Sequence, residues 1–113
     1  MKKRKRSTTA KGTQYEEHVA AKMRWHGYKF IKRCGGSGDQ GADLIAHTGL
    51  FGRKVVVQCK CYKGKVGNGA VQEVFAAKQY YRASIAIVAT NSTFTDSAQQ
   101  LARACGVQLW ERY

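Results

Sequence analysis

The amino-acid sequence predicts an α/β domain in which helices flank a mixed central sheet. Two apolar runs predict strands: Val55-Val56-Val57 marks the strongest strand of the chain, and Ile85 to Thr90 predicts a central strand buried on both faces. Between them, apolar residues recur at helical spacing. A helix between two strands is typical of a right-handed crossover, which makes the two strands parallel. A chain of 113 residues has the usual size of one domain.

The first half of the chain is expected to fold as a helix followed by three strands. Apolar residues recur every four positions at Tyr15, Val19 and Met23, which predicts an amphipathic helix. This helix is expected to begin near Gly12 and to end at Gly27. The three strands are expected over residues 28–34, 42–47 and 54–61. Short connections between them predict an antiparallel meander.

The second half of the chain is expected to add two helices and two strands. Asn68 is a candidate N-cap of the crossover helix, and Thr95 is a candidate N-cap of a third helix that Gly106 ends. The strand over Ile85 to Thr90 lies between these helices, and a short last strand is expected over Val107 to Trp110. The predicted order of elements is therefore α-β-β-β-α-β-α-β.

Basic residues dominate the charge of the chain. Twenty Lys and Arg against seven Asp and Glu give a net charge of +13, which favours binding to polyanions, nucleic acid above all. Residues 1–11 hold six of these cations, no acid and no apolar periodicity, so they predict a disordered basic arm; residues 12–113 keep +7. The arm's candidates for non-specific phosphate contacts are Lys2, Lys3, Arg4, Lys5, Arg6 and Lys11.

The sequence favours an intracellular, cytoplasmic protein of the bacterial, archaeal or phage type. The basic start is not followed by the apolar stretch of a signal peptide, and no apolar run approaches the ~20 residues that cross a bilayer. The basic arm also lacks apolar side chains that would bury in lipid, so no membrane partner is expected. The four cysteines lack the spacing of a metal knuckle or a redox pair, which predicts four free thiols that are buried or half-buried.

Three polar residues are expected to converge at one end of the sheet. Asp43 lies in an apolar strand, where a carboxylate is costly unless it is paired or bound to metal. Gln58 and Lys60 share one face of the next strand, and a hairpin could place Asp43 beside them. Oxygens of Asp43, Gln58 and the Cys59 carbonyl could hold a hard divalent cation, and Glu16 could complete its shell directly or through water. Lys60 could orient the attacking water.

Several motifs resemble the catalytic domain of Mrr-type restriction endonucleases, a QxK variant within the PD-(D/E)xK nuclease superfamily. The motifs are Gly12-x-x-Tyr15-Glu16, Gly38-Asp39-x-Gly41-x-Asp43, Gln58-x-Lys60 and Thr90-Asn91-x-x-Phe94-Thr95-x-x-Ala98. The resemblance covers residues 12–110 and implies a restriction-endonuclease-like αβββαβ core, so that residues 12–113 form the Mrr-like catalytic domain. It further implies hydrolysis of DNA that depends on Mg²⁺, with Mn²⁺ as an alternative, in DNA restriction or repair.

The resemblance also implies a role for each matching residue. Asp43 would bind the metal, Gln58 would stand where most of the superfamily has an acid, and Lys60 would be the catalytic lysine. Glu16 would be the helix-borne acid that archaeal Holliday-junction resolvases share. An amide at position 58 removes one negative charge, which predicts weaker metal binding. Asp39 and Gln72 are further candidates for a position near the nucleic acid.

Other interpretations remain open. A structure-selective resolvase of the Holliday-junction type would act as a symmetric homodimer and prefer a four-way junction. A non-catalytic nucleic-acid-binding module with the same fold would bind in a salt-sensitive manner without metal. Glu16 could simply favour a helix N-terminus, Asp43 could pair with Lys60, and Asp39 could be a turn former. The chain is too short for a recognition domain, so a separate recognition subunit or domain is an expected partner.

Overall fold

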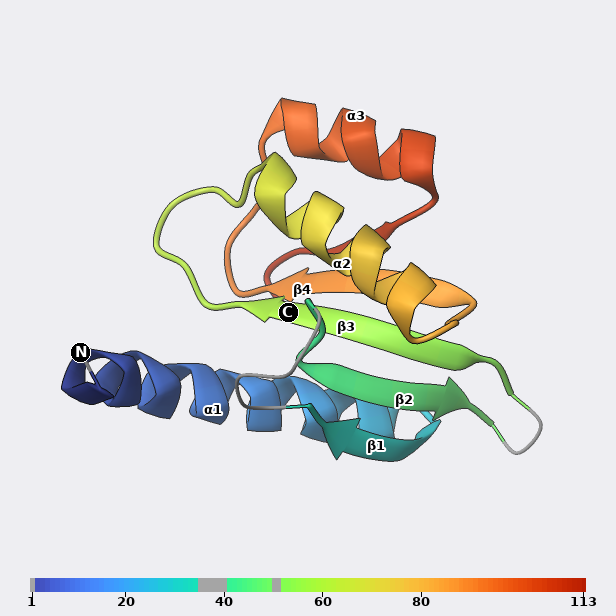
Figure 1. The fold of residues 1–113 in the computed structure, drawn as a ribbon, viewed down its shortest axis with the longest axis horizontal. Helices are drawn as coiled ribbons and strands as arrows, with labels where there is room; N and C mark the ends of the chain where they lie inside the picture. Colours follow the sequence, from blue (N-terminus) through green and yellow to red (C-terminus); the bar gives the residue numbers. More distant parts are fainter. Residues whose placement is uncertain (1, 35–40, 50–51) are drawn as a thin grey trace.

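The structure, a computed structural model, contains a five-stranded mixed sheet between two helical layers (Figure 1). It describes residues 2–34, 41–49 and 52–113, with side chains from residue 12 onwards. The elements are α1 (Lys2–Trp25), β1 (Tyr28–Arg33), β2 (Leu44–Thr48), β3 (Lys54–Lys60), α2 (Asn68–Tyr80), β4 (Ile85–Thr90), α3 (Asp96–Cys105) and β5 (Gln108–Trp110). Their order confirms the predicted α-β-β-β-α-β-α-β and the α/β class.

The strands lie in the order β1-β2-β3-β4-β5, so β3 is central. The pairs β1–β2 and β2–β3 are antiparallel, whereas β3–β4 and β4–β5 are parallel. Val57 of β3 is opposite Leu44 on one side and Ile87 on the other. Both the predicted meander and the predicted crossover through α2 are therefore confirmed.

The apolar core has two parts, one on each face of the sheet. Val56 packs with α2 and α3 on one face, whereas Val55 and Val57 pack with α1 on the other (Figure 1). All three valines are fully buried, and burying one such side chain contributes about 1.5–3 kcal/mol. The strand that leads to Gln58 and Lys60 is thus held from both sides.

Helix α1 is longer than the sequence predicted. It begins at Lys2, so residues 2–11 continue the helix where a disordered arm was expected, and the start near Gly12 was wrong. Lys and Arg have high helix propensity, and a single glycine inside a helix costs only about 1 kcal/mol. Apolar periodicity could not reveal this extension because it has no apolar stripe. The side chains of residues 2–11 lie outside the described part, so their phosphate contacts stay a prediction.

The ends of the other two helices follow the predicted signals in one case only. The Thr95 side chain accepts a hydrogen bond from the Ala98 amide at 3.0 Å, and Gly106 ends α3 at a φ of 73°. For α2, the N-cap is Gly67 and not Asn68, and no side chain caps this helix. Among residues 2–34, 41–49 and 52–113, no helix combines the length and apolar character that a bilayer crossing requires.

Candidate active site

Asp43 precedes β2 and is tied to its neighbours by three backbone groups. Its amide donates to the Val57 carbonyl at 2.7 Å, and its carbonyl accepts from the Cys34 amide at 2.8 Å. Its carboxylate Oδ2 accepts from the Cys59 amide at 2.7 Å, a charge-assisted bond of short length. Because Cys59 stands between Gln58 and Lys60, the carboxylate is anchored at the end of β3 that carries both residues.

Gln58 and Lys60 lie on the face of β3 that α2 covers, and both contact Glu73 of α2. The Gln58 amide Nε2 donates to Glu73 Oε1 at 3.2 Å. Lys60 Nζ forms an ion pair with the same oxygen at 3.3 Å. Gln58 is only 8% exposed, whereas the Glu73 side chain is 53% exposed. The group of polar residues therefore extends from a buried amide to the solvent-accessible side of α2.

Glu73 was not among the residues predicted from the sequence, which indicated the neighbouring Gln72 instead. Gln72 is exposed on α2. The sequence does contain a feature that predicts the position of Glu73. Glu73 is three residues after Ala70 and four before Ala77, and both alanines are buried. Residues at these spacings lie on the same side of a helix. A carboxylate bordering a buried stripe was therefore the feature to examine.

The Gln58 side chain leaves one polar atom unsatisfied. Its NH₂ group faces the Glu73 carboxylate, so its carbonyl Oε1 points elsewhere, and this oxygen is buried without a hydrogen-bond partner among the described residues. A buried polar group left unpaired costs about 1–3 kcal/mol. The unsatisfied Gln58 Oε1 belongs to the residue directly before Cys59, whose amide binds the Asp43 carboxylate. This arrangement indicates a position for a cation or an ordered water.

The oxygen atoms present suit a hard divalent cation. Asp43 offers a carboxylate and Gln58 an amide oxygen, both of which Mg²⁺ and Mn²⁺ accept. Across the described ranges, no three His, Cys, Asp or Glu side chains group closely enough to hold a metal ion. A cation at this place would therefore depend on an amide or backbone oxygen in addition to carboxylates.

Glu16 lies on α1, in the layer on the other side of the sheet from α2. Arg33 of β1 donates to Glu16 Oε1 from Nη2 at 2.9 Å and from Nε at 3.3 Å. Arg33 also pairs more loosely with Glu17 at 3.7 Å. The structure thus joins Glu16 to Arg33, whereas Gln58 and Lys60 share Glu73.

Residues at the end of β4 fix the backbone at Lys60, the last residue of β3, and just after it. Thr90 Oγ1 donates to the Lys60 carbonyl at 2.6 Å. The Asn91 side chain accepts from the Tyr62 amide at 2.8 Å and donates to the Tyr62 carbonyl at 3.0 Å. The Tyr62 ring lies 5.9 Å from Lys60 Nζ. These contacts give a physical reason for the Thr90-Asn91 motif, because they position Lys60 and the residues after it.

The glycine-rich loop before Asp43 is described only at its ends. Residues 35–40 lie outside the described part, and with them Asp39, whose role stays a prediction. Gly41 has a φ of 86°, and a Cβ at this position would lie 2.6 Å from the Glu73 carbonyl oxygen. Only glycine allows the chain to pass this close to α2. The backbone two residues before Asp43 therefore packs directly against the backbone of Glu73.

Burial raises the pKa of the Cys59 thiol well above its ordinary value. The negative charges of Asp43 and Glu16 raise this pKa further, and the positive charge of Arg33, the smallest of these effects, lowers it. All four cysteines are described and free; Cys34, Cys59 and Cys105 are half-buried, whereas Cys61 is exposed, contrary to the prediction for this residue. The Cys59 thiol is thus kept neutral, and the chemistry of the site belongs to its oxygen and nitrogen atoms.

We expect Cys59 to resist alkylation at pH 8 while the exposed Cys61 reacts. A thiol pKa that rises on folding stabilises the folded state below the ordinary value of 9.0, and this contribution is lost as the pH rises above it. Iodoacetamide labelling with peptide mass spectrometry measures the first effect. Urea unfolding at pH 8 and pH 10 measures the second, and Cys59→Ala should lose less stability over this interval than the unchanged protein. Equal labelling of Cys59 and Cys61 would contradict the assignment.

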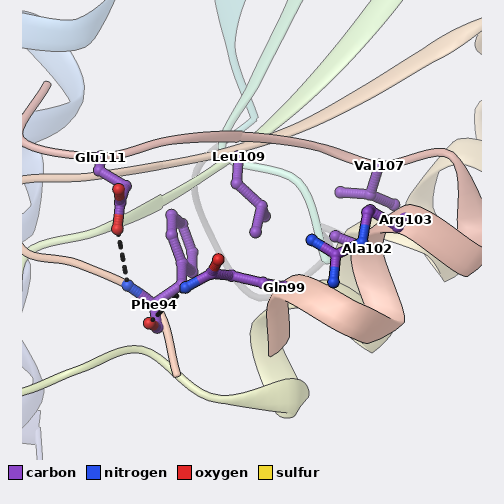
Figure 2. Close-up of a pocket in the computed structure, with 7 residues that line it drawn as sticks. All are labelled: Phe94, Gln99, Ala102, Arg103, Val107, Leu109 and Glu111. Atoms are coloured by element: carbon purple, nitrogen blue, oxygen red, sulfur yellow. Dashed lines mark hydrogen bonds between the residues drawn. The ribbon is translucent and has the colours of Figure 1, made fainter. Parts of the chain in front are cut away.

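A separate hollow lies between α3 and β5, away from these residues (Figure 2). It has a volume of about 260 Å³. It is lined by Phe94, Gln99, Ala102, Arg103, Val107, Leu109 and Glu111. Its single carboxylate, Glu111, accepts a hydrogen bond from the Phe94 amide at 3.2 Å, and Gln99 donates to the Phe94 carbonyl at 3.2 Å. The polar groups there mainly fix the backbone, so the hollow lacks the grouped acid, amide and lysine of the site at β3.

Comparison with protein families gives a match over nearly the whole chain. The Mrr_cat family model, described as a restriction endonuclease, matches residues 8–113. An uncharacterised mitochondrial protein of Schizosaccharomyces pombe is 34% identical over 98 residues. This similarity covers 81% of the chain but only 39% of that relative's length.

Comparison with solved structures identifies similar folds. A protein of unknown function, AF1548, has a TM-score of 0.69 at 18% identity, and the match covers 86% of this chain and 56% of that one. EndoMS in complex with double-stranded DNA gives 0.57 at 19% identity, covering 75% and 36%. The MspJI restriction endonuclease with a 27-mer oligonucleotide gives 0.57 at 25% identity, covering 87% and 24%. The chain shares the restriction-endonuclease-like fold and spans a minor part of the last two structures.

Proposed function

Because the chain belongs to the Mrr_cat family of restriction endonucleases, we propose that it hydrolyses phosphodiester bonds of DNA with a metal-activated water. One observation carries the proposal most directly. The Asp43 carboxylate is anchored on the amide of Cys59, and the side chain of the preceding residue, Gln58, has a buried and unsatisfied amide oxygen. Lys60 is on the same end of β3.

Each residue of this group has a distinct task in the proposal. Asp43 and Gln58 would hold Mg²⁺ or Mn²⁺ through their side-chain oxygens, with the Cys59 carbonyl as a further ligand. A cation held there supplies Lewis acidity toward a phosphoryl oxygen and lowers the pKa of bound water. The Lys60 ammonium can only donate hydrogen bonds, so it would orient the oxygen of the attacking water and offset charge on the phosphate.

DNA is the proposed substrate. The net charge of +13 attracts a polyanion, and the six cations of residues 2–11 would add affinity that does not depend on base sequence. Two structurally similar proteins, EndoMS and MspJI, are complexed with double-stranded DNA and an oligonucleotide respectively. We expect products with 5′-phosphate and 3′-hydroxyl ends.

The test is nicking of a supercoiled plasmid by the purified protein in Mg²⁺, in Mn²⁺ and in excess chelator. We expect open-circular and linear DNA with either cation and none with chelator, because the oxygen ligands have no role without a cation. Gel analysis measures the rate. Cleavage that is equally fast in chelator would reject the metal mechanism. Salt-sensitive binding without any cleavage would instead indicate a non-catalytic nucleic-acid-binding module.

A further inference from the structure

A cation site built on Asp43 and Gln58 contains a single side-chain negative charge. The amide oxygen of Gln58 is neutral, and so is the Cys59 carbonyl. Cation affinity depends on the number of charged ligands, and Mg²⁺ commonly relies on one or two carboxylates. A second carboxylate close to Gln58 would therefore restore the charge that the amide lacks.

Glu73 is a carboxylate beside Gln58, on the side of its Nε2, and a half-turn of the amide that exchanges Oε1 and Nε2 would bring the oxygen to the same side. Glu73 Oε1 lies 3.2 Å from Gln58 Nε2 and 3.3 Å from Lys60 Nζ, so it contacts both residues of the β3 motif. Its side chain is 53% exposed, which leaves the carboxylate accessible to an ion from solvent. Glu16 lies on α1, on the other side of the sheet from α2, and is bonded to Arg33, whereas Glu73 contacts Gln58 itself.

The backbone at Glu73 is fixed relative to Asp43. Gly41 approaches the Glu73 carbonyl so closely that a Cβ would lie 2.6 Å from it. Asp43 follows two residues later, and two residues span at most about 7 Å. On the other side, Ala70, Val74 and Ala77 are buried and hold α2 against the sheet. The two carboxylates thus come from separate elements that one close contact keeps together.

We propose that Glu73 supplies the second carboxylate of the cation site, in place of the acid that position 58 lacks. The inference rests on the proposed function, because it assumes that Asp43 and Gln58 bind a divalent cation. It assigns a metal-binding role to a residue of α2 that lies outside the β2 and β3 motifs. In this arrangement the negative charge needed at the site can come from position 58 or from position 73.

Mn²⁺ binding to the DNA-free protein, followed by electron paramagnetic resonance of the free ion, tests this inference. Glu73→Gln should weaken Mn²⁺ binding at least ~10-fold, as expected for a lost group at a metal site. Gln58→Glu should strengthen it, and the double variant Gln58→Glu/Glu73→Gln should return to the affinity of the unchanged protein, because the number of carboxylates is the same. Asp96→Asn removes the same charge from an exposed position of α3 and should leave the affinity unchanged.

The outcomes separate the inference from the function on which it rests. If Glu73→Gln binds Mn²⁺ as the unchanged protein does, and that protein cleaves plasmid, the role of Glu73 is rejected and the nuclease proposal stands. If Glu73 acted only through Lys60, Glu73→Gln would leave Mn²⁺ affinity unchanged in a Lys60→Ala background, and this result also rejects the inference. If the unchanged protein neither binds Mn²⁺ nor cleaves DNA, both proposals fail. Circular dichroism verifies that each variant is folded.

Discussion

Asp43→Asn is expected to lower the rate of plasmid nicking in Mg²⁺ by at least ~100-fold, a loss typical of removing one electrostatic group from an active site. Asparagine keeps the size of the side chain and can still accept the hydrogen bond from the Cys59 amide, so the strand should stay in place. What it removes is the negative charge that would hold the cation. Lys60→Ala should cause a loss of similar size, because it removes the ammonium that would orient the water and offset charge on the phosphate.

Two comparisons make this result specific. Asp96→Asn carries the same change in net charge on an exposed residue of α3, and it should cleave at the unchanged rate. Binding of the variants to DNA in chelator, measured by fluorescence anisotropy, should differ little from the unchanged protein, since the basic residues supply most of the attraction. Asp43→Asn and Lys60→Ala proteins that nick plasmid at the full rate would refute the assigned roles.

Gly41→Ala is expected to reduce both stability and cleavage. A left-handed backbone conformation costs an alanine about 1–2 kcal/mol. Here the added Cβ would also lie 2.6 Å from the Glu73 carbonyl oxygen, and such overpacking costs typically about 1–3 kcal/mol more. The chain would have to move away from α2, which displaces Asp43 from β3 or Glu73 from Lys60. Urea unfolding and plasmid nicking measure the two effects.

Gly27→Ala is the matched control for this substitution. Gly27 has a φ of 98°, close to the 86° of Gly41, but a Cβ there would meet nothing within 4 Å. It should therefore show the conformational cost alone and retain cleavage. Equal losses of stability and activity in the two variants would show that the contact with Glu73 has no special importance.

The strands and the last helix could be predicted because local signals agree with the final packing. The run Val55-Val56-Val57 predicts the strongest strand of the chain, and it forms β3 at the centre of the sheet with a core on each side. Thr95 and Gly106 mark the ends of α3 through chemistry that is local to the chain. Helix α1 was predicted too short because its first residues contribute no apolar stripe.

The candidate site could be predicted only in part. Gln58 and Lys60 lie on β3 and Asp43 directly precedes the neighbouring β2, so alternation along the two predicted strands is enough to expect them at one end of the sheet. The contact of Glu73 with Gln58 depends on the rotation of α2 about its own axis, which the packing of Gly41 and the buried alanines determines. Likewise, the ion pair between Glu16 and Arg33 joins α1 to β1, and no spacing in the sequence indicates it.

A crystal soaked in Mn²⁺ tests the central claim most directly, since the anomalous signal of the ion locates it without reference to activity. We predict one strong peak within bonding distance of the Asp43 carboxylate and Gln58 Oε1, with the Glu73 carboxylate turned toward it. A peak elsewhere on the protein, with Gln58 Oε1 still without a partner, would contradict the account.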